Sequence, residues 1–140
     1  MKVYTGECFC GSVKYRLDEA PHSPRSCHCS RCRKVFSAQA SAYAVVSPDA
    51  FNWIEGEHLL TAYVGEHGGG VLFCSICGST MCGTVSGTIH GITLGCLNED
   101  PPFKLEPHIF VGSKAAWETI PDDAAQYETY PDSSKSPPDD

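Results

Sequence analysis

The sequence has no long hydrophobic run, since no stretch approaches the roughly 18 apolar residues of a membrane-spanning helix. Residues 1–8 lack the apolar segment of a secretory signal peptide. Basic residues are scarce: the sequence contains 10 lysines and arginines but 17 acidic residues, which gives a formal net charge of −7. This balance disfavours nucleic acid, whose phosphates attract a basic face. We expect a cytoplasmic protein that binds neither membranes nor nucleic acid.

The sequence also contains no internal repeat and no long amphipathic helix. Residues 12–17 alternate polar and apolar side chains with the period of two that is typical of a half-buried strand. Further β-prone segments occur at residues 38–46, 51–54, 59–64, 88–97 and 108–111. These patterns predict one mainly β domain over residues 1–130, a normal domain size. The polar, acidic and proline-rich residues 131–140 predict a disordered tail.

Other segments are expected to lack strands. Two prolines predict a loop over residues 19–24, and three consecutive glycines disfavour regular structure in residues 65–70. Ser113 can cap a short helical turn over residues 114–119, with Trp117 as its buried anchor.

Cysteine, in contrast, is abundant, and its spacing is the most informative feature of the chain. Nine cysteines also suit a disulfide framework, but the count is odd and the chain shows no secretory segment. We therefore interpret the closely spaced cysteines as metal ligands. Seven of them form three groups: Cys8-x-Cys10, Cys27-x-Cys29-x-x-Cys32 and Cys74-x-x-Cys77.

The two pairs of cysteines can together form one metal site with four sulfur ligands. In an extended segment, residues two apart point to the same side, so Cys8 and Cys10 can place both sulfurs on one metal ion. Cys74 and Cys77 are spaced as in a metal-binding knuckle, and Gly78 suits the crowded backbone that follows such a turn. Zinc binding by small peptides is worth roughly 10–16 kcal/mol, which rivals the stability of a whole domain.

The remaining group is a trio, Cys27, Cys29 and Cys32, and a single six-residue segment contains all three. Structural zinc almost always has four protein ligands, whereas catalytic zinc keeps three and an open position. The trio therefore predicts a zinc ion that can bind a substrate atom. Three residues elsewhere offer a fourth ligand that would close this site: Cys82, Cys96 and His90.

The partition of the cysteines and the role of the nearby histidine stay open at this point. A site that combines Cys8 and Cys10 with Cys27 and Cys29 is also geometrically conceivable. His28 lies between two ligands of an extended segment, so its ring is expected to point away from the metal. This predicts a supporting or surface position for His28 rather than a ligand.

Four segments together resemble a known family: residues 6–15 (GECFCGSVKY), 27–33 (CHCSRCR), 73–79 (FCSICGS) and 108–117 (HIFVGSKAAW). The chain resembles the glutathione-dependent formaldehyde-activating enzyme family, which includes centromere protein V-like domains, over nearly all of residues 4–131. The resemblance implies an Mss4-like fold of small, coiled antiparallel sheets. It also implies synthesis of S-(hydroxymethyl)glutathione from glutathione and formaldehyde, a carbon-sulfur lyase activity.

The resemblance further implies two zinc ions per chain. It assigns a structural zinc ion to Cys8, Cys10, Cys74 and Cys77, and a catalytic zinc ion to Cys27, Cys29 and Cys32. Two segments depart from the family pattern. Val35 and Phe36 stand where the family often has glycine and small residues, and residues 70–72 lack the basic residue that commonly precedes the second knuckle. Both departures affect the expected substrate pocket.

We hypothesise that a substrate thiol occupies the open position as a thiolate and adds to formaldehyde or a related small aldehyde. A thiol of pKa about 8.5 is only slightly ionised at pH 7, so full ionisation is worth about 2 kcal/mol. The carboxylates of glutathione suit a local basic cluster of Arg31, Arg33 and Lys34. His28 is a further candidate for substrate binding, and His28 and His90 are candidate proton donors.

Two other function classes are compatible with the sequence. A zinc-stabilised binding module without chemistry would close the trio with a fourth protein ligand. Redox chemistry would use Cys82 or Cys96, although isolated cysteines more often pack as small hydrophobic residues. The sequence leaves a monomer and a homodimer equally open.

Overall fold

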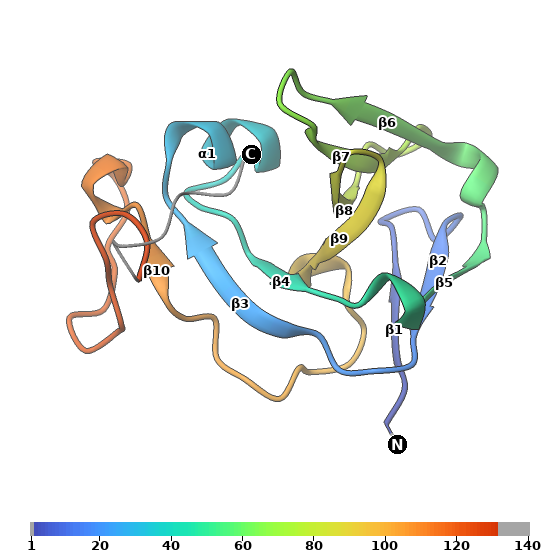
Figure 1. The fold of residues 1–140 in the computed structure, drawn as a ribbon, viewed down its shortest axis with the longest axis horizontal. Coiled ribbons are helices and arrows are strands. Elements are labelled where there is room, and N and C mark those ends of the chain that lie inside the picture. Colours follow the sequence, from blue (N-terminus) through green and yellow to red (C-terminus); the bar gives the residue numbers. More distant parts are fainter. Residues whose placement is uncertain (1, 132–140) are drawn as a thin grey trace. The chain divides into compact units, whose positions relative to one another are not determined.

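The computed structural model describes residues 2–131. It is mainly β, and its described part contains one α-helix, α1 (Ser30–Phe36), as Figure 1 shows. The chain divides into two compact units. Of the described residues, unit 1 contains 2–23 and 44–102, and unit 2 contains 24–43 and 103–131. The predicted mainly β class is confirmed, while a single domain over residues 1–130 stays a prediction.

Unit 1 contains a three-stranded antiparallel sheet in the order β1-β2-β5. Its strands are β1 (Tyr4–Glu7), β2 (Lys14–Leu17) and β5 (Phe51–Glu55). The alternation predicted for residues 12–17 is confirmed, because Tyr15 and Leu17 are fully buried while Lys14 and Arg16 are half-buried. The short 3-10 helix η1 (Pro48–Ala50) leads directly into β5.

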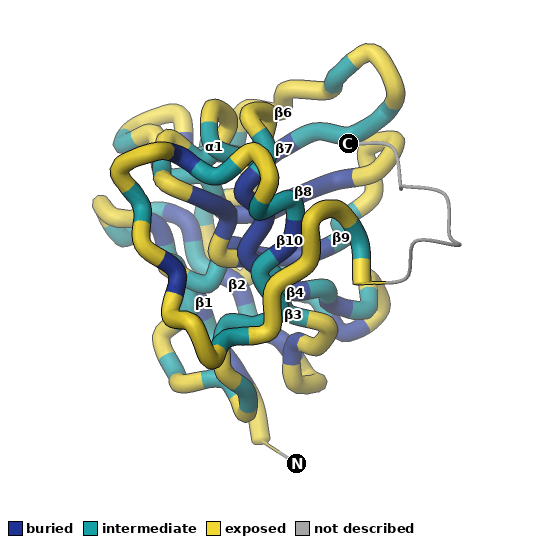
Figure 2. Tube along the Cα trace, turned by 90° about the vertical axis from the view of Figure 1, so that its left-hand side faces the viewer, coloured by how far each residue is buried: buried dark blue, intermediate teal, exposed yellow. Residues whose placement is uncertain are grey.

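A four-stranded antiparallel meander completes the sheets of unit 1. Its strands are β6 (Leu60–Val64), β7 (Gly69–Cys74), β8 (Thr80–Val85) and β9 (Thr88–Thr93). Adjacent strands pair in sequence order, which leaves β6 at the edge. The tube in Figure 2 shows β8 as largely buried and β6 as largely exposed. The short 3-10 helices η2 (Glu57–Leu59) and η3 (Leu94–Cys96) flank the meander.

The glycine-rich segment ends in a strand, so the prediction of a loop over residues 65–70 is wrong for its last two residues. Gly69 and Gly70 are the first residues of β7. A Cβ atom at Gly70 would collide with the carbonyl oxygen of Tyr63 on the neighbouring strand. Glycine is therefore required here for close pairing of two strands, as well as for flexibility.

The hydrophobic core of unit 1 lies between these strands. Its fully buried side chains include Tyr15, Leu17, Met81 and Ile92. Two of the predicted metal ligands, Cys8 and Cys74, belong to the same buried cluster. A metal ion held by these two cysteines would therefore be anchored directly to the core.

Unit 2 is built around a short parallel pairing between β3 (His22–Cys27), most of which belongs to this unit, and β10 (His108–Ile109). The Ser26 N–H donates to the carbonyl of Pro107, and the His28 N–H donates to the carbonyl of Ile109. Helix α1 follows β3, and β4 (Tyr43–Val45) runs from unit 2 into unit 1. Because β3 begins at His22, the loop predicted for residues 19–24 ends earlier than expected.

A short helical turn is present as the 3-10 helix η4 (Val111–Ser113), but the predicted bounds of 114–119 are wrong, because none of those residues is helical. Lys114 ends it with an extended ψ of 140°. The prediction that Trp117 is a buried anchor is wrong, because its side chain is 73% exposed. Ala115 and Ile120 are buried instead.

The C-terminal prediction concerns residues that the structure mostly leaves undescribed. Residues 132–140 of the predicted disordered tail lie outside the described residues. No helix within residues 2–131 combines the length and the apolar character needed to cross a membrane.

Candidate metal centres

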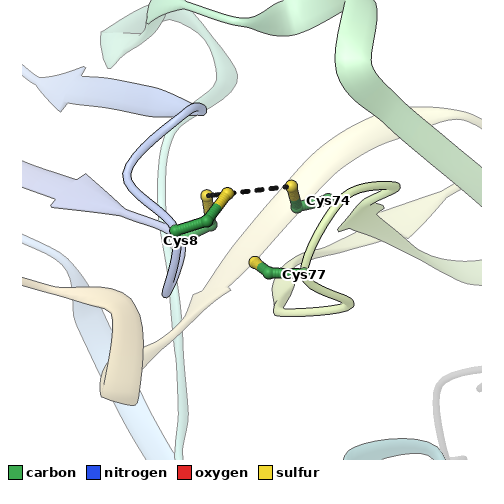
Figure 3. A group of neighbouring side chains, drawn as sticks. Cys8, Cys74 and Cys77 are labelled. Carbon is green, nitrogen blue, oxygen red and sulfur yellow. Dashed lines mark hydrogen bonds between the residues drawn. The ribbon is translucent and has the colours of Figure 1, made fainter.

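Unit 1 brings together the four cysteines of the first predicted site, and all their sulfur atoms lie within 4.8 Å of one another. Figure 3 shows the sulfurs of Cys8, Cys74 and Cys77 pointing toward one another from the loop after β1, the end of β7 and the turn that follows β7. The Cys8 and Cys10 sulfurs are 3.6 Å apart, and those of Cys10 and Cys74 are 3.9 Å apart. Tetrahedral zinc with bonds of about 2.3 Å places sulfurs about 3.8 Å apart. The four thiols therefore fit one zinc ion.

Each pair of cysteines lies in a tight turn that ends in a glycine. The Gly11 N–H donates to the carbonyl of Cys8, and the Gly78 N–H donates to that of Cys74. Gly11 and Gly78 have φ angles of +78° and +82°, a region that other residues rarely occupy. The two turns therefore share a final glycine with a left-handed φ, although the hydrogen bond spans three residues in the first turn and four in the second.

Two serines support this centre. The Ser79 hydroxyl lies 3.2 Å from the Cys77 sulfur and accepts a hydrogen bond from the Phe9 N–H. Hydrogen bonds from the Ser79 hydroxyl and backbone lower the pKa of Cys77 to about 5. The hydroxyl and backbone of Ser12 similarly lower the pKa of Cys10. Both serines therefore favour the thiolate form that a metal ion requires, and the spacing of the cysteines alone did not indicate this role.

Unit 2 brings together the predicted trio of Cys27, Cys29 and Cys32, again with all sulfurs within 4.8 Å of one another. Within the described residues of this unit, no fourth Cys, His, Asp or Glu ligand atom joins the group. Cys27 is buried, while Cys29 and Cys32 are half-buried. The trio could hold a metal ion with fewer than four protein ligands from its own unit.

The local fold explains how one short segment gathers three sulfurs. Cys27 is the last residue of β3, and Cys29 is the N-cap of α1, with φ −66° and ψ 155°. The Cys29 sulfur accepts a hydrogen bond from the Cys32 N–H at 3.3 Å, as an N-cap side chain does. The chain therefore changes from strand to helix between the first and third cysteines. The prediction of an extended segment holds only for its first part.

Ser41 fixes the backbone of the first member of the trio. The Cys27 N–H donates to the Ser41 hydroxyl at 2.8 Å, and the Ser41 N–H donates to the Cys27 carbonyl at 3.0 Å. The three thiols also influence one another. Hydrogen bonds with Cys27 and Cys32 lower the pKa of Cys29, whereas hydrogen bonds with Cys27 and Cys29 raise the pKa of Cys32. Without a cation, one thiol of the trio therefore ionises at the expense of another.

His28 is fully buried, so a surface position for this residue is ruled out. Its Nε2 atom lies 2.9 Å from Nδ1 of His108, which is half-buried on β10. Burial lowers the pKa of His28, and its electrostatic interaction with the neighbouring His108 lowers it further. His28 thus supports the segment between Cys27 and Cys29 from inside the unit. The sequence analysis did not predict His108 as its partner.

The basic residues near the trio are placed differently from one another. Arg31 and Lys34 are exposed on α1. Arg33 is half-buried, and its Nε–H donates to the carbonyl of His28 at 3.3 Å. Arg33 therefore has a structural contact next to the trio, whereas Lys34 and Arg31 present charge at the surface.

The residues that the sequence offered as a fourth ligand belong to unit 1. Cys82 is fully buried in the core cluster, and burial raises its pKa. The Cys96 sulfur, half-buried, lies 3.7 Å from the carbonyl oxygen of Thr80. His90 is half-buried on β9. None of the three belongs to the four-cysteine group of its own unit.

The fold and the two cysteine groups define a small, mainly β protein with two candidate metal centres. A model of the family described as "Glutathione-dependent formaldehyde-activating enzyme" matches residues 3–113, which contain all seven grouped cysteines. The chain belongs to this family, as the sequence resemblance predicted.

A protein of known crystal structure has a fold similar to that of this chain. The chain is similar to a protein of Rhodobacter sphaeroides whose crystal structure is known, with 26% sequence identity and a TM-score of 0.54. The similarity covers 70% of this chain and 91% of the other. The comparison with curated proteins found no match.

Proposed function

We propose that this protein is a zinc-dependent carbon-sulfur lyase of the S-(hydroxymethyl)glutathione synthase type. Its substrates would be glutathione and formaldehyde or a related small aldehyde. The observation that carries this proposal is the group of three thiols in unit 2, which gains no fourth ligand from the described residues of that unit. The family description supports glutathione and formaldehyde as the substrate classes.

The two groups of thiols suit different roles. Cys8, Cys10, Cys74 and Cys77 offer four ligands, as a structural zinc ion requires, and two of them belong to the core of unit 1. We assign the second zinc ion to Cys27, Cys29 and Cys32, whose three ligands match the usual number in a catalytic site. The cytoplasm, where thiols stay reduced, suits both sets of ligands.

Zinc at the trio would supply one chemical function, which is to stabilise the thiolate form of a substrate thiol near neutral pH. The protein residues would then do the remaining work. The trio fixes the place of the reacting sulfur because Ser41, His28 and the start of α1 hold its backbone. Orienting two reactants in this way accelerates their addition, even when it also proceeds in water.

Binding of glutathione requires groups that hold its two carboxylates. Arg31 and Lys34 are exposed on α1, on either side of Cys32 in the sequence, and can donate charge-assisted hydrogen bonds to carboxylates. Arg33 is half-buried and donates to the His28 carbonyl beside the trio. We assign the carboxylate contacts to the basic cluster of Arg31, Arg33 and Lys34, with His28 in a supporting position.

Metal analysis tests the separation of the two sites. The wild-type protein is expected to contain two zinc ions, and Cys32→Ser is expected to contain one while its circular dichroism stays native. Ser30→Ala, next to the trio but without a ligand atom, is the matched control. Loss of both ions from Cys32→Ser would contradict two independent sites.

Exchange NMR of formaldehyde with glutathione tests the chemistry. The wild-type protein is expected to accelerate exchange between the free aldehyde and its glutathione adduct, and Cys32→Ser is expected to lose this acceleration. An exchange rate equal to that of the buffer at full zinc occupancy would contradict the proposed reaction. That result would instead support a zinc-stabilised binding module.

A further inference from the structure

His28 lies between the first two cysteines of the trio, and both its backbone and its ring have partners in unit 2. Its backbone N–H donates to the carbonyl of Ile109 at 2.9 Å. Its carbonyl accepts a hydrogen bond from the Arg33 Nε–H at 3.3 Å, and its ring Nε2 atom lies 2.9 Å from Nδ1 of His108. The residue that links two cysteines of the trio is therefore fixed at its backbone and at its ring.

Strand pairing places the ring of His28 and the sulfur of Cys27 on opposite faces. Ser26 of β3 pairs with His108 of β10, and Cys27 pairs with Ile109. Successive side chains of an extended segment alternate between its two faces, so His28, two residues after Ser26, presents its ring on the face of His108. The centroids of the two rings are 5.2 Å apart, which agrees with this alternation. An anchor for the ring therefore also fixes the direction in which the neighbouring sulfurs point.

Burial decides which of the two rings donates the hydrogen bond. The side chain of His28 is fully buried, and its Nδ1 atom has no hydrogen-bond partner within residues 2–131. If His108 donated, the proton of His28 would sit on Nδ1, as a buried N–H without an acceptor. If His28 donates from Nε2, its Nδ1 atom carries only an unused lone pair. Orphaned buried N–H groups are rarer in proteins than acceptors with unused capacity, so Nδ1 of His108 is the acceptor.

We propose that His108 is a positioning residue for the zinc site of unit 2. Its Nδ1 atom accepts the Nε2–H of His28, and this bond holds the turn that presents the sulfurs of Cys27 and Cys29 to one ion. Ser41 fixes the backbone of Cys27, and His108 fixes the residue that follows it. The inference rests on the proposed function, since it assigns a zinc ion to the trio.

Zinc affinity tests the proposal with a matched set of variants. His108→Leu removes the acceptor but keeps a side chain of similar volume, and it is expected to raise the Kd of the trio for zinc about tenfold. His108→Asn places an amide oxygen near the position of Nδ1 and is expected to recover most of this loss. His22→Leu makes the same change at an exposed position of β3 and should leave the affinity unchanged.

Competition with a chelator measures the Kd, and cadmium-113 NMR of the cadmium-substituted protein separates the two centres. Only the resonance of the trio should move in His108→Leu, while that of the four-cysteine group stays in place. An unchanged Kd in His108→Leu would overturn the proposal. A loss that His108→Asn fails to recover would show that the ring acts by packing alone, and would overturn it as well.

Nitrogen-15 NMR of the zinc-loaded wild type tests the hydrogen bond directly, without a variant that has to fold. The ring of His28 is expected to be protonated at Nε2 and bare at Nδ1, with a coupling across the hydrogen bond to Nδ1 of His108. A proton on Nδ1 of His28 would contradict the proposed bond. None of these measurements uses glutathione or an aldehyde. A protein with both metal centres that fails to accelerate exchange would therefore contradict the proposed reaction and leave the role of His108 unaffected.

Discussion

The Nε2 atom of His28 lies 2.9 Å from the Nδ1 atom of His108, and this contact joins the segment of the three cysteines to β10. Parallel pairing reinforces it, since His108 and Ile109 of β10 pair with Ser26 and Cys27, the two residues just before His28. Nδ1 of His28 has no hydrogen-bond partner among the described residues, although the ring is fully buried. The ring therefore depends on His108 for its one side-chain hydrogen bond.

Loss of this contact should destabilise unit 2. His108→Ala would leave both ring nitrogens of a buried imidazole without a partner, which costs about 1–3 kcal/mol in the free energy of unfolding. Urea denaturation of the zinc-saturated protein measures this loss. His22→Ala, at an exposed position of β3, is the control and should change stability little. Equal losses in the two variants would show that the contact has no special role.

Removal of the Ser79 hydroxyl should weaken zinc binding by the four-cysteine group. The folded protein holds the pKa of Cys77 at about 5, first through the Ser79 hydroxyl, so this thiol stays ionised as the pH falls toward that value. Ser79→Ala raises that pKa, so zinc should be released at a higher pH. Loss of such a supporting contact typically lowers metal affinity about tenfold or more.

Zinc release on acid titration, followed with a chromogenic chelator, measures the effect of Ser79→Ala. Ser75→Ala, at an exposed position of the same knuckle, is the matched control. Identical release curves for the wild type and both variants would contradict a role for the Ser79 hydroxyl.

A side chain at residue 6 should disrupt the core of unit 1. Gly6 on β1 lies against the buried ring of Tyr15, and a Cβ atom there would overlap the ring. Overpacking of a core typically costs about 1–3 kcal/mol, so Gly6→Ala should lower the free energy of unfolding by this amount. Gly95→Ala is the control, because a Cβ atom at Gly95 meets no atom within 4 Å. If thermal melts give both variants equal stability, the ring of Tyr15 moves aside easily.

The two ungrouped cysteines should react slowly with alkylating reagents. Burial raises the pKa of Cys82, and burial is also the first cause of the raised pKa of Cys96. Thiolate is the reactive form, so few reactive groups are present at pH 8. Mass spectrometry after iodoacetamide treatment of the native, zinc-loaded protein should find Cys82 unmodified and Cys96 modified slowly. Rapid labelling of Cys82 would revive the redox hypothesis.

The parts of the fold that follow from local pattern were predictable. Residues 51–54 and 59–64 were expected to be strands and are β5 and β6, because their apolar and β-branched residues match the pleat of a sheet. The three cysteine motifs were also predictable from their spacing, whereas their division into a group of four and a group of three followed from the family resemblance. The structure brings the sulfurs of each group within 4.8 Å of one another.

Other elements depend on contacts that the sequence does not display. Strand β8 (Thr80–Val85) was not predicted, because it is buried on both sides and shows no alternation of polar and apolar residues. Helix α1 was not predicted either, since its seven residues include no buried one and its N-cap is a cysteine. The partnership of His28 with His108 spans 80 residues and arises only when β10 pairs with β3.

The sequence positions of the two cysteine groups determine the order in which the groups can form during synthesis. All three sulfurs of the trio leave the ribosome on one short segment, before Cys74 has been translated. The other centre has to wait, since 64 residues separate Cys10 from Cys74. A nascent chain can therefore complete the trio of unit 2 first, whereas the four-cysteine group, two members of which belong to the core of unit 1, forms only after Cys77 has been made.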